Sequence, residues 1–186
     1  MFGYYGYYEA PSIHQINDKI WISNCEAAYS KKLLKERGIT HILAAGNGLE
    51  KKFPGEFTYL HLRLNDIPSQ NLFPTFKEAI KFIDQGQKVL VHCHAGISRS
   101  SSNVIAYLMW KNGWSYTEAY HYVKRGRPIV NPNPGFVNQL KRLEFQLKNG
   151  EFDLESPSTS TFSTTSAYSS PYKSSTLKSD TYSRTQ

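Results

Sequence analysis

The segment from Lys88 to Met109, KVLVHCHAGISRSSSNVIAYLM, changes its residue pattern abruptly at Cys93. Before the cysteine, a short run rich in β-branched residues has the character of a buried central strand. After Ser98, apolar residues recur at the spacing of one helix face. The segment therefore predicts a strand, a tight loop and a helix in direct succession, which is a building block of sheets covered by helices.

The rest of the chain continues this alternation, with helices dominating the second half. Residues 13–23 predict a hairpin, 39–46 and 57–64 two further strands, and 26–38 and 74–86 helices that end at glycines. Ser115 with Glu118 forms a capping box for a helix over 116–126, and Asn133-Pro134 begins another that continues to 148. We predict an α/β fold with a central, mainly parallel sheet flanked by helices.

Composition divides the chain into three parts. Residues 1–12 are rich in Gly and Tyr, and residues 156–186 contain 18 Ser or Thr in 31 positions. Neither has an apolar pattern that could offset the entropy of ordering. We therefore predict a disordered N-terminus over 1–12, a catalytic domain over 13–150 and a disordered Ser/Thr-rich tail over 151–186.

The net charge indicates an anionic partner. The whole chain has a net charge of +7. Residues 151–186 hold three Lys or Arg against four Asp or Glu, a net charge of −1, so residues 1–150 have a net charge of +8. A basic domain favours phosphorylated protein, nucleic acid or acidic lipid. Scattered basic residues argue against nucleic acid, and the short apolar runs argue against a membrane span. With two cysteines and no leader pattern, we expect a soluble monomer in the cytoplasm, or in the nucleus as well.

The loop after Cys93 has the properties of an anion-binding site. It lies where open α/β sheets place ligands, beyond the carboxyl end of a strand. The following helix offers unpaired N–H groups and the positive end of its dipole. Gly96 allows a tight turn, Arg99 adds a planar fork that matches two phosphate oxygens, and the same field favours an ionised thiol. A thiolate beneath an anion predicts phosphoryl transfer through a phosphocysteine intermediate.

Two simpler interpretations of Cys93 compete with this one. An isolated cysteine at a strand end is usually an inert, small apolar residue. The histidines on either side could suggest a metal site, but neighbouring strand residues point to opposite faces, and no second Cys/His cluster supplies further ligands. We expect neither a metal nor a cofactor.

The stretch HCHAGISRS matches the HCxxGxxRS signature of the cysteine-dependent protein phosphatases and resembles their dual-specificity branch. The resemblance extends from about residue 13 to 147 and includes IWISNCEAA, GITHILAAG, LNDIPSQNLFPTFKEAIKFI and YVKRGRPIVNPNPGFVNQLKRLE. Because the chain leaves no room for a separate kinase-docking domain ahead of this unit, it resembles the small, atypical members. The resemblance implies the dual-specificity phosphatase fold.

The resemblance also implies roles for individual residues. Cys93 would be the nucleophile, Arg99 would bind the transferring phosphoryl group, and Asp66 in LNDIPSQNL would be the general acid. The phosphate-binding backbone would comprise His94, Ala95, Gly96, Ile97, Ser98 and Arg99, supported by His92 and Ser100. An Asp two positions before a Pro is ordinarily turn chemistry, and Asp84 is the rival carboxylate, although a helix-end surface position suits it better. We expect Cys25 to pack in the core; pairing with Cys93 is the alternative.

The variable loop positions bear on the substrate. Residues 94, 95 and 97 include no lysine, unlike the phosphoinositide phosphatases of this superfamily. A shallow pocket that accepts phosphotyrosine and phosphoserine or phosphothreonine on proteins, signalling kinases among them, is the leading hypothesis. The alternative is a catalytically weak scaffold of the same fold that binds phosphoproteins. Retention of Cys93, Arg99 and Asp66 favours the enzyme.

Overall fold

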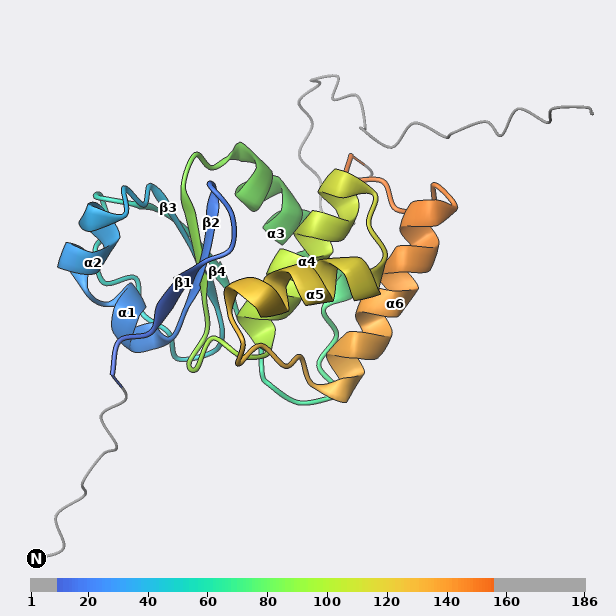
Figure 1. The fold of residues 1–186 in the computed structure, drawn as a ribbon, viewed down its shortest axis with the longest axis horizontal. Coiled ribbons are helices and arrows are strands. Elements are labelled where there is room, and N and C mark those ends of the chain that lie inside the picture. Colours follow the sequence, from blue (N-terminus) through green and yellow to red (C-terminus); the bar gives the residue numbers. More distant parts are fainter. Residues whose placement is uncertain (1–9, 156–186) are drawn as a thin grey trace, which may run out of the picture.

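The computed structural model describes residues 10–155, and these form one five-stranded sheet with helices on both faces (Figure 1). The strands are β1 (Ile13–Gln15), β2 (Ile20–Ser23), β3 (His41–Ala45), β4 (Thr58–Leu62) and β5 (Val89–His92), in the order β1-β2-β5-β3-β4. The edge strand β1 runs antiparallel to β2, and the other pairings are parallel. The predicted α/β class and mainly parallel sheet are confirmed.

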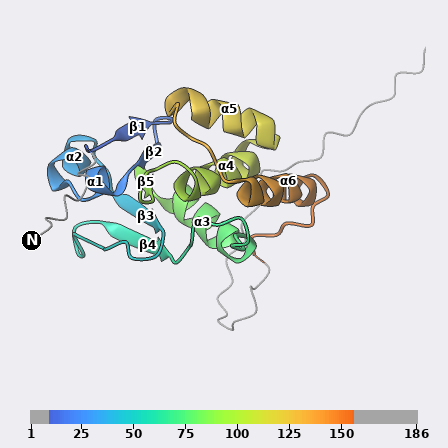
Figure 2. The ribbon, with the colours of Figure 1, turned by 90° about the horizontal axis from the view of Figure 1, so that it is seen from below.

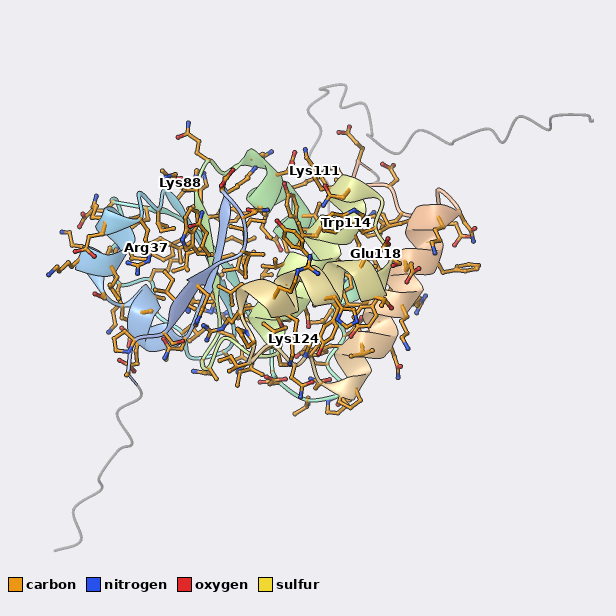
Figure 3. All side chains as sticks on the ribbon, viewed as in Figure 1. Arg37, Lys88, Lys111, Trp114, Glu118 and Lys124 are labelled. Carbon is orange, nitrogen blue, oxygen red and sulfur yellow. The ribbon has the colours of Figure 1, made fainter. Side chains whose placement is uncertain are left out.

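The helices cover the two faces unequally. On one face lie the short helices α1 (Cys25–Ala28) and α2 (Lys31–Glu36), and on the other lie α3 (Phe73–Gln85), α4 (Arg99–Asn112), α5 (Tyr116–Gly126) and α6 (Pro134–Lys148) (Figure 2). A small apolar cluster under α1 and α2 and a much larger one under α3–α6 hold these layers together. Side chains fill the space between the layers (Figure 3). Helix α4, which follows the Cys93 loop, is buried along almost its whole length.

The helix predicted over residues 26–38 is wrong in one respect, because the structure divides it into α1 and α2. Ser30 has extended backbone angles, and its hydroxyl accepts a hydrogen bond from the N–H of Leu33, so it caps a new helix instead of continuing the old one. The Tyr29 hydroxyl accepts from the N–H of Glu50, which anchors the break to the loop after β3. The predicted capping box of Ser115 and Glu118 is present.

Both ends of the described region extend beyond the predicted domain limits. Asn24 bonds the backbone of Ala10 and Ser12, which holds residues 10–12 beside β2. At the other end, Phe152 and Leu154 pack against the large core. The remainder of the predicted tails, 1–9 and 156–186, lies outside the described residues. Within 10–155, no helix has the length and apolar character needed to cross a membrane.

The register of the sheet brings the carboxyl ends of four strands to one edge. Ser23 pairs with His92, His92 with Ala44, and Ala45 with Leu62. The residues that follow these strands therefore meet at that edge, as expected for a ligand site in a parallel sheet. Among them are Cys93 after β5 and the segment after β4 that carries Asp66.

Candidate active site

Cys93 lies immediately after β5 and is 1% exposed. Its Sγ accepts a hydrogen bond from the backbone N–H of Gly96 at 3.2 Å and lies 3.3 Å from the Ser100 hydroxyl. The loop therefore turns back on the cysteine, so that the sulfur lies against a backbone donor and a hydroxyl group.

The loop's carbonyl groups point away from the sulfur. Those of residues 94–97 all accept hydrogen bonds from outside the loop, and the donors come from three separate segments. The backbone N–H of Cys25 bonds residue 94 at 2.8 Å, the guanidinium of Arg127 bonds residues 95 and 96 at 3.0 and 2.8 Å, and the N–H of Asn131 bonds residue 97 at 3.0 Å. Because the C=O and N–H of a trans peptide point in opposite directions, this arrangement turns the N–H groups to the inner side of the loop, where that of Gly96 donates to Cys93 Sγ.

Gly96 makes the turn possible. Its φ of 70° lies in the left-handed region, which favours glycine. A Cβ at this position would also lie 2.5 Å from the backbone oxygen of Ser23 and 2.8 Å from Nη2 of Arg127. The predicted role of Gly96 as the residue that permits the loop backbone is thus consistent with both conformation and space.

The amino end of α4 has no side-chain cap. Ser98 occupies the cap position, but its hydroxyl makes no bond to the helix N–H groups. It donates instead to Oδ1 of Asp66 at 2.7 Å. The first N–H groups of α4 thus receive no side-chain acceptor from their own cap residue, and the helix end keeps its affinity for an anion.

Arg99 begins α4 and is 9% exposed. Its Nη1 donates to the carbonyl oxygen of Leu64 at 3.3 Å. A Cβ at Gly46 would lie 2.8 Å from that same nitrogen, so the absence of a side chain at Gly46 makes room for the guanidinium. Its Nε lies at ion-pair distance, 3.5 Å, from Oδ2 of Asp66 but without hydrogen-bond geometry. It is one of three buried side-chain polar atoms in the described region that have no hydrogen-bond partner.

Asp66 follows β4 and meets the Cys93 loop from the side. Besides the Ser98 hydroxyl, the amide of Asn133 donates to Oδ1, at 2.9 Å. Asn133 also caps α6, through its own Oδ1, and its backbone N–H donates to Ser98 Oγ. The carboxyl group, 33% exposed, is therefore fixed through one oxygen while the other faces Arg99.

His92 lies beneath the loop and is 1% exposed. Burial lowers its pKa from 6.5 to about 4, with a backbone contact to Cys93 opposing this in part and the neighbouring His61 and His94 adding to it. The imidazole is therefore neutral at physiological pH. In this form it contributes shape and hydrogen-bonding capacity to the loop, but no positive charge.

The structure brings Asp66 and the predicted residues of the Cys93 loop together at one edge of the sheet. His94 is exposed, and its Nε2 lies 3.2 Å from the carbonyl oxygen of Asn47. Asp84, the rival carboxylate, contacts Tyr107 and Lys111 at the far end of α4, and its side chain is 13% exposed, so the expected surface position is only partly correct. Cys25 is half-buried at the start of α1, not in the core.

Sequence reasoning missed Arg127 and the second function of Asn133. Arg127 stands in the run KRGRP, where neighbouring basic residues suggest a solvated surface. Asn133 was recognised as a helix cap, but nothing in its sequence context indicates a bond to Asp66. Among residues 10–155, no group of three or more His, Cys, Asp or Glu could hold a metal ion.

Comparison with known proteins agrees with this geometry. Residues 20–146 match the family described as dual specificity phosphatase, catalytic domain. The MAP kinase phosphatase with leucine-rich repeats protein 2 of Dictyostelium discoideum is 41% identical over 135 residues, which cover 71% of this chain but only 19% of that protein.

Two solved structures share the fold over nearly their full length. DUSP15 has 32% identity and a TM-score of 0.66, covering 75% of this chain and 98% of its own. The human tyrosine phosphatase-like serine/threonine/tyrosine-interacting protein has 38% identity and a TM-score of 0.64, covering 72% and 95%. From the matched domain, the shared fold and the loop around Cys93, we conclude that this chain belongs to the dual specificity phosphatase family and resembles its small, atypical members.

Proposed function

We propose that this protein hydrolyses phosphotyrosine and phosphoserine or phosphothreonine on proteins through a phosphocysteine intermediate. The observation that carries the proposal is the buried Nε–H of Arg99, which faces Asp66 at ion-pair distance but has no hydrogen-bond partner, beside a loop whose Gly96 N–H donates to the Cys93 sulfur. A buried donor without a hydrogen bond costs up to about 1–3 kcal/mol. A phosphate oxygen in this position would satisfy it.

In the first step, the Cys93 thiolate attacks phosphorus, the S–P bond forms and the bond from phosphorus to the substrate oxygen breaks. The leaving oxygen takes a proton from Asp66. Because Oδ1 of Asp66 already accepts from Ser98 and Asn133, Oδ2 is the oxygen positioned to carry that proton. Arg99, which lies 3.5 Å from Oδ2 in this structure, would turn its fork to the phosphoryl oxygens.

In the second step, water attacks the phosphocysteine, Asp66 accepts its proton and the S–P bond breaks. Sulfur then leaves as the thiolate. The Ser100 hydroxyl and the Gly96 N–H, at 3.3 and 3.2 Å from Sγ, stabilise the departing charge. The cycle ends with release of inorganic phosphate and needs no cofactor.

The acceptance of both types of phosphoresidue is supported by the exposure of the acid side of the site. Asp66 is 33% exposed and the adjacent Ile67 is 48% exposed, so a short phosphoserine and a long phosphotyrosine can both approach. The name of the Dictyostelium relative suggests phosphorylated signalling kinases as substrates. We further propose that the protein is a monomer located in the cytoplasm, or in the nucleus as well.

A binding module is the second candidate function. The relative named as a tyrosine phosphatase-like interacting protein favours it, because that name describes interaction and not hydrolysis. In such a module the loop would hold a phosphoprotein without turnover. The presence of a nucleophile, an arginine and an acid in one site favours the enzyme.

The deciding experiment is hydrolysis of an aryl phosphate and of phosphotyrosine and phosphothreonine peptides by the full chain. We expect turnover by the wild type, its abolition in Cys93→Ser with oxyanion binding retained, and near-normal turnover in the matched control Cys25→Ser. Rapid quenching should trap phosphate on Cys93. Binding without turnover by the wild type would establish the module instead.

A further inference from the structure

Arg127 is the largest fully buried side chain in the described region, with an exposure of 0%. It lies at the carboxyl end of α5, where its own N–H closes the helix on Val123. Nε donates to the carbonyl oxygen of Gly96 at 2.8 Å, and Nη2 to that of Ala95 at 3.0 Å. One guanidinium thus holds two consecutive peptide groups of the Cys93 loop.

These two bonds determine which way the loop N–H groups point. When the carbonyl of Ala95 is held outward, the N–H of Gly96 in the same peptide turns inward, and it donates to Cys93 Sγ. The carbonyl of Gly96 fixes the N–H of Ile97 in the same way. No neutral side chain could make both of these charge-assisted hydrogen bonds at once.

Ser12, just before the edge strand β1, and His14 within that strand complete the surroundings of Arg127. Its Nη1 donates to the Ser12 hydroxyl at 3.0 Å and to Nδ1 of His14 at 2.6 Å. Since arginine only donates, Nδ1 of His14 must be unprotonated. Burial and, secondarily, the charge of Arg127 lower the pKa of His14, in agreement with this state. Both partners lie before residue 20, where the match to the family begins.

We propose that Arg127 is a positioning residue, which holds the phosphate-binding loop open to an oxyanion, and that Ser12 and His14 hold Arg127 in place. The inference rests on the proposed function only for its effect on hydrolysis. The segment that precedes the matched domain is thereby part of the active-site support, not merely an edge strand.

The first test compares the full-length variants Arg127→Met and Arg127→Lys with the control Arg125→Met, which removes an exposed arginine from the same helix. Tungstate, a tetrahedral oxyanion, serves as the probe, and its affinity is measured by calorimetry. We expect Arg127→Met to lose about tenfold or more, somewhat less than the roughly 100-fold cost of a direct oxyanion donor. Arg127→Lys should recover part of the loss, because a lysine can reach one carbonyl but not both.

Two further measurements separate positioning from folding. In Arg127→Met, both the tungstate affinity and the rate at which iodoacetate alkylates Cys93 should fall. In Arg125→Met, both quantities should match those of the wild type. If Arg127→Met does not fold, the double variant Ser12→Ala/His14→Ala, in and just before the edge strand, leaves Arg127 present, and we expect it to weaken tungstate binding severalfold. Wild-type affinity in a folded Arg127→Met, or in this double variant, would overturn the proposal.

The outcomes also distinguish this inference from the proposed function. If the wild type binds tungstate through Arg127 but hydrolyses no phosphoester, the positioning role stands and the enzymatic function fails. If hydrolysis occurs and tungstate binding is independent of Arg127, the enzymatic function stands and the positioning role fails.

Discussion

Two loops build the site, and they are held in different ways. The nucleophile loop, residues 93–99, is fixed through its backbone, since its carbonyls are bonded from outside and its turn is closed on Cys93 Sγ. The acid loop, residues 64–72, is exposed over 65–69 and is held mainly by side chains. Its anchors are Ser98 and Asn133, which cap α4 and α6, and Gln139 of α6, all more than 30 residues later in the chain than Asp66.

In the proposed mechanism, this difference separates two tasks. The oxyanion must meet the same donors with every substrate, so a rigid backbone loop suits it. The proton must reach leaving oxygens of different length and direction, which an exposed carboxyl group held through one oxygen can serve. Damage to the nucleophile loop should therefore affect all substrates alike, and damage to the acid loop should depend on the leaving group.

Of the substitutions that leave Cys93 in place, Gly96→Ala should be the most damaging. The added Cβ would collide with the Ser23 backbone oxygen at a φ that disfavours alanine, so the loop must rearrange. We expect kcat/KM to fall by at least about 100-fold and equally on aryl phosphates and phosphopeptides. Steady-state kinetics on both substrate classes provide the measurement. Losses that differ between the classes would contradict the division between the two loops.

Asp66→Asn should show the opposite pattern. On protein phosphoresidues, whose leaving oxygens need a proton, the loss should reach about 100-fold or more. On an aryl phosphate with a very good leaving group, the loss in the first step should be small. The ratio of kcat/KM values on the two substrates reports this directly. A small, uniform loss would mean that another carboxyl group acts as the acid.

The sequence predicted the nucleophile loop well because its determinants are local. A strand, a cysteine, a glycine and a helix start follow one another, and each leaves its own pattern. The prediction of Asp66 depends on resemblance alone, since its contacts to Ser98 and Asn133 are tertiary. Arg127 was missed for the same reason. The break between α1 and α2 was also not predicted. It depends on Ser30, which caps α2 although its neighbours in the sequence favour a continuous helix.

His92 offers a test of how enclosed the nucleophile loop is. In the unfolded chain it takes up a proton below about pH 6.5, but in the folded protein only near pH 4. Between these values the unfolded state binds more protons, so the free energy of unfolding falls as the pH falls, and no penalty remains above about pH 7. The full effect is on the order of 3 kcal/mol.

Denaturant unfolding of the wild type and of His92→Asn across pH 8 to 4 isolates this contribution. The asparagine cannot titrate, so the stability difference between the two proteins should be constant above about pH 7. It should then shift in favour of His92→Asn as the pH falls. A difference that stays constant down to pH 4 would show that His92 is accessible and that the loop is less enclosed than its burial indicates.

The smallest effect should come from Asn133→Ser, which separates the two functions of Asn133. Serine caps a helix about as well as asparagine, so the bond that Asn133 accepts from Phe136 N–H is replaced in kind. The donation to Asp66 Oδ1 is lost, because the shorter serine cannot reach from the cap position to the carboxyl group while its hydroxyl serves the helix. Ser98 remains as a donor to that oxygen, and the site is partly exposed, so the loss in kcat on phosphopeptides should be at most about tenfold.

The matched variant Asn133→Ala removes both functions. It should show the same kinetic loss and, in addition, about 1 kcal/mol less stability from the uncapped helix. Neither variant should alter tungstate affinity, because the nucleophile loop is held by other residues. If Asn133→Ser weakens tungstate binding as much as it slows turnover, the two loops are coupled through the Ser98–Asp66 hydrogen bond at 2.7 Å, and the acid loop takes part in shaping the oxyanion site.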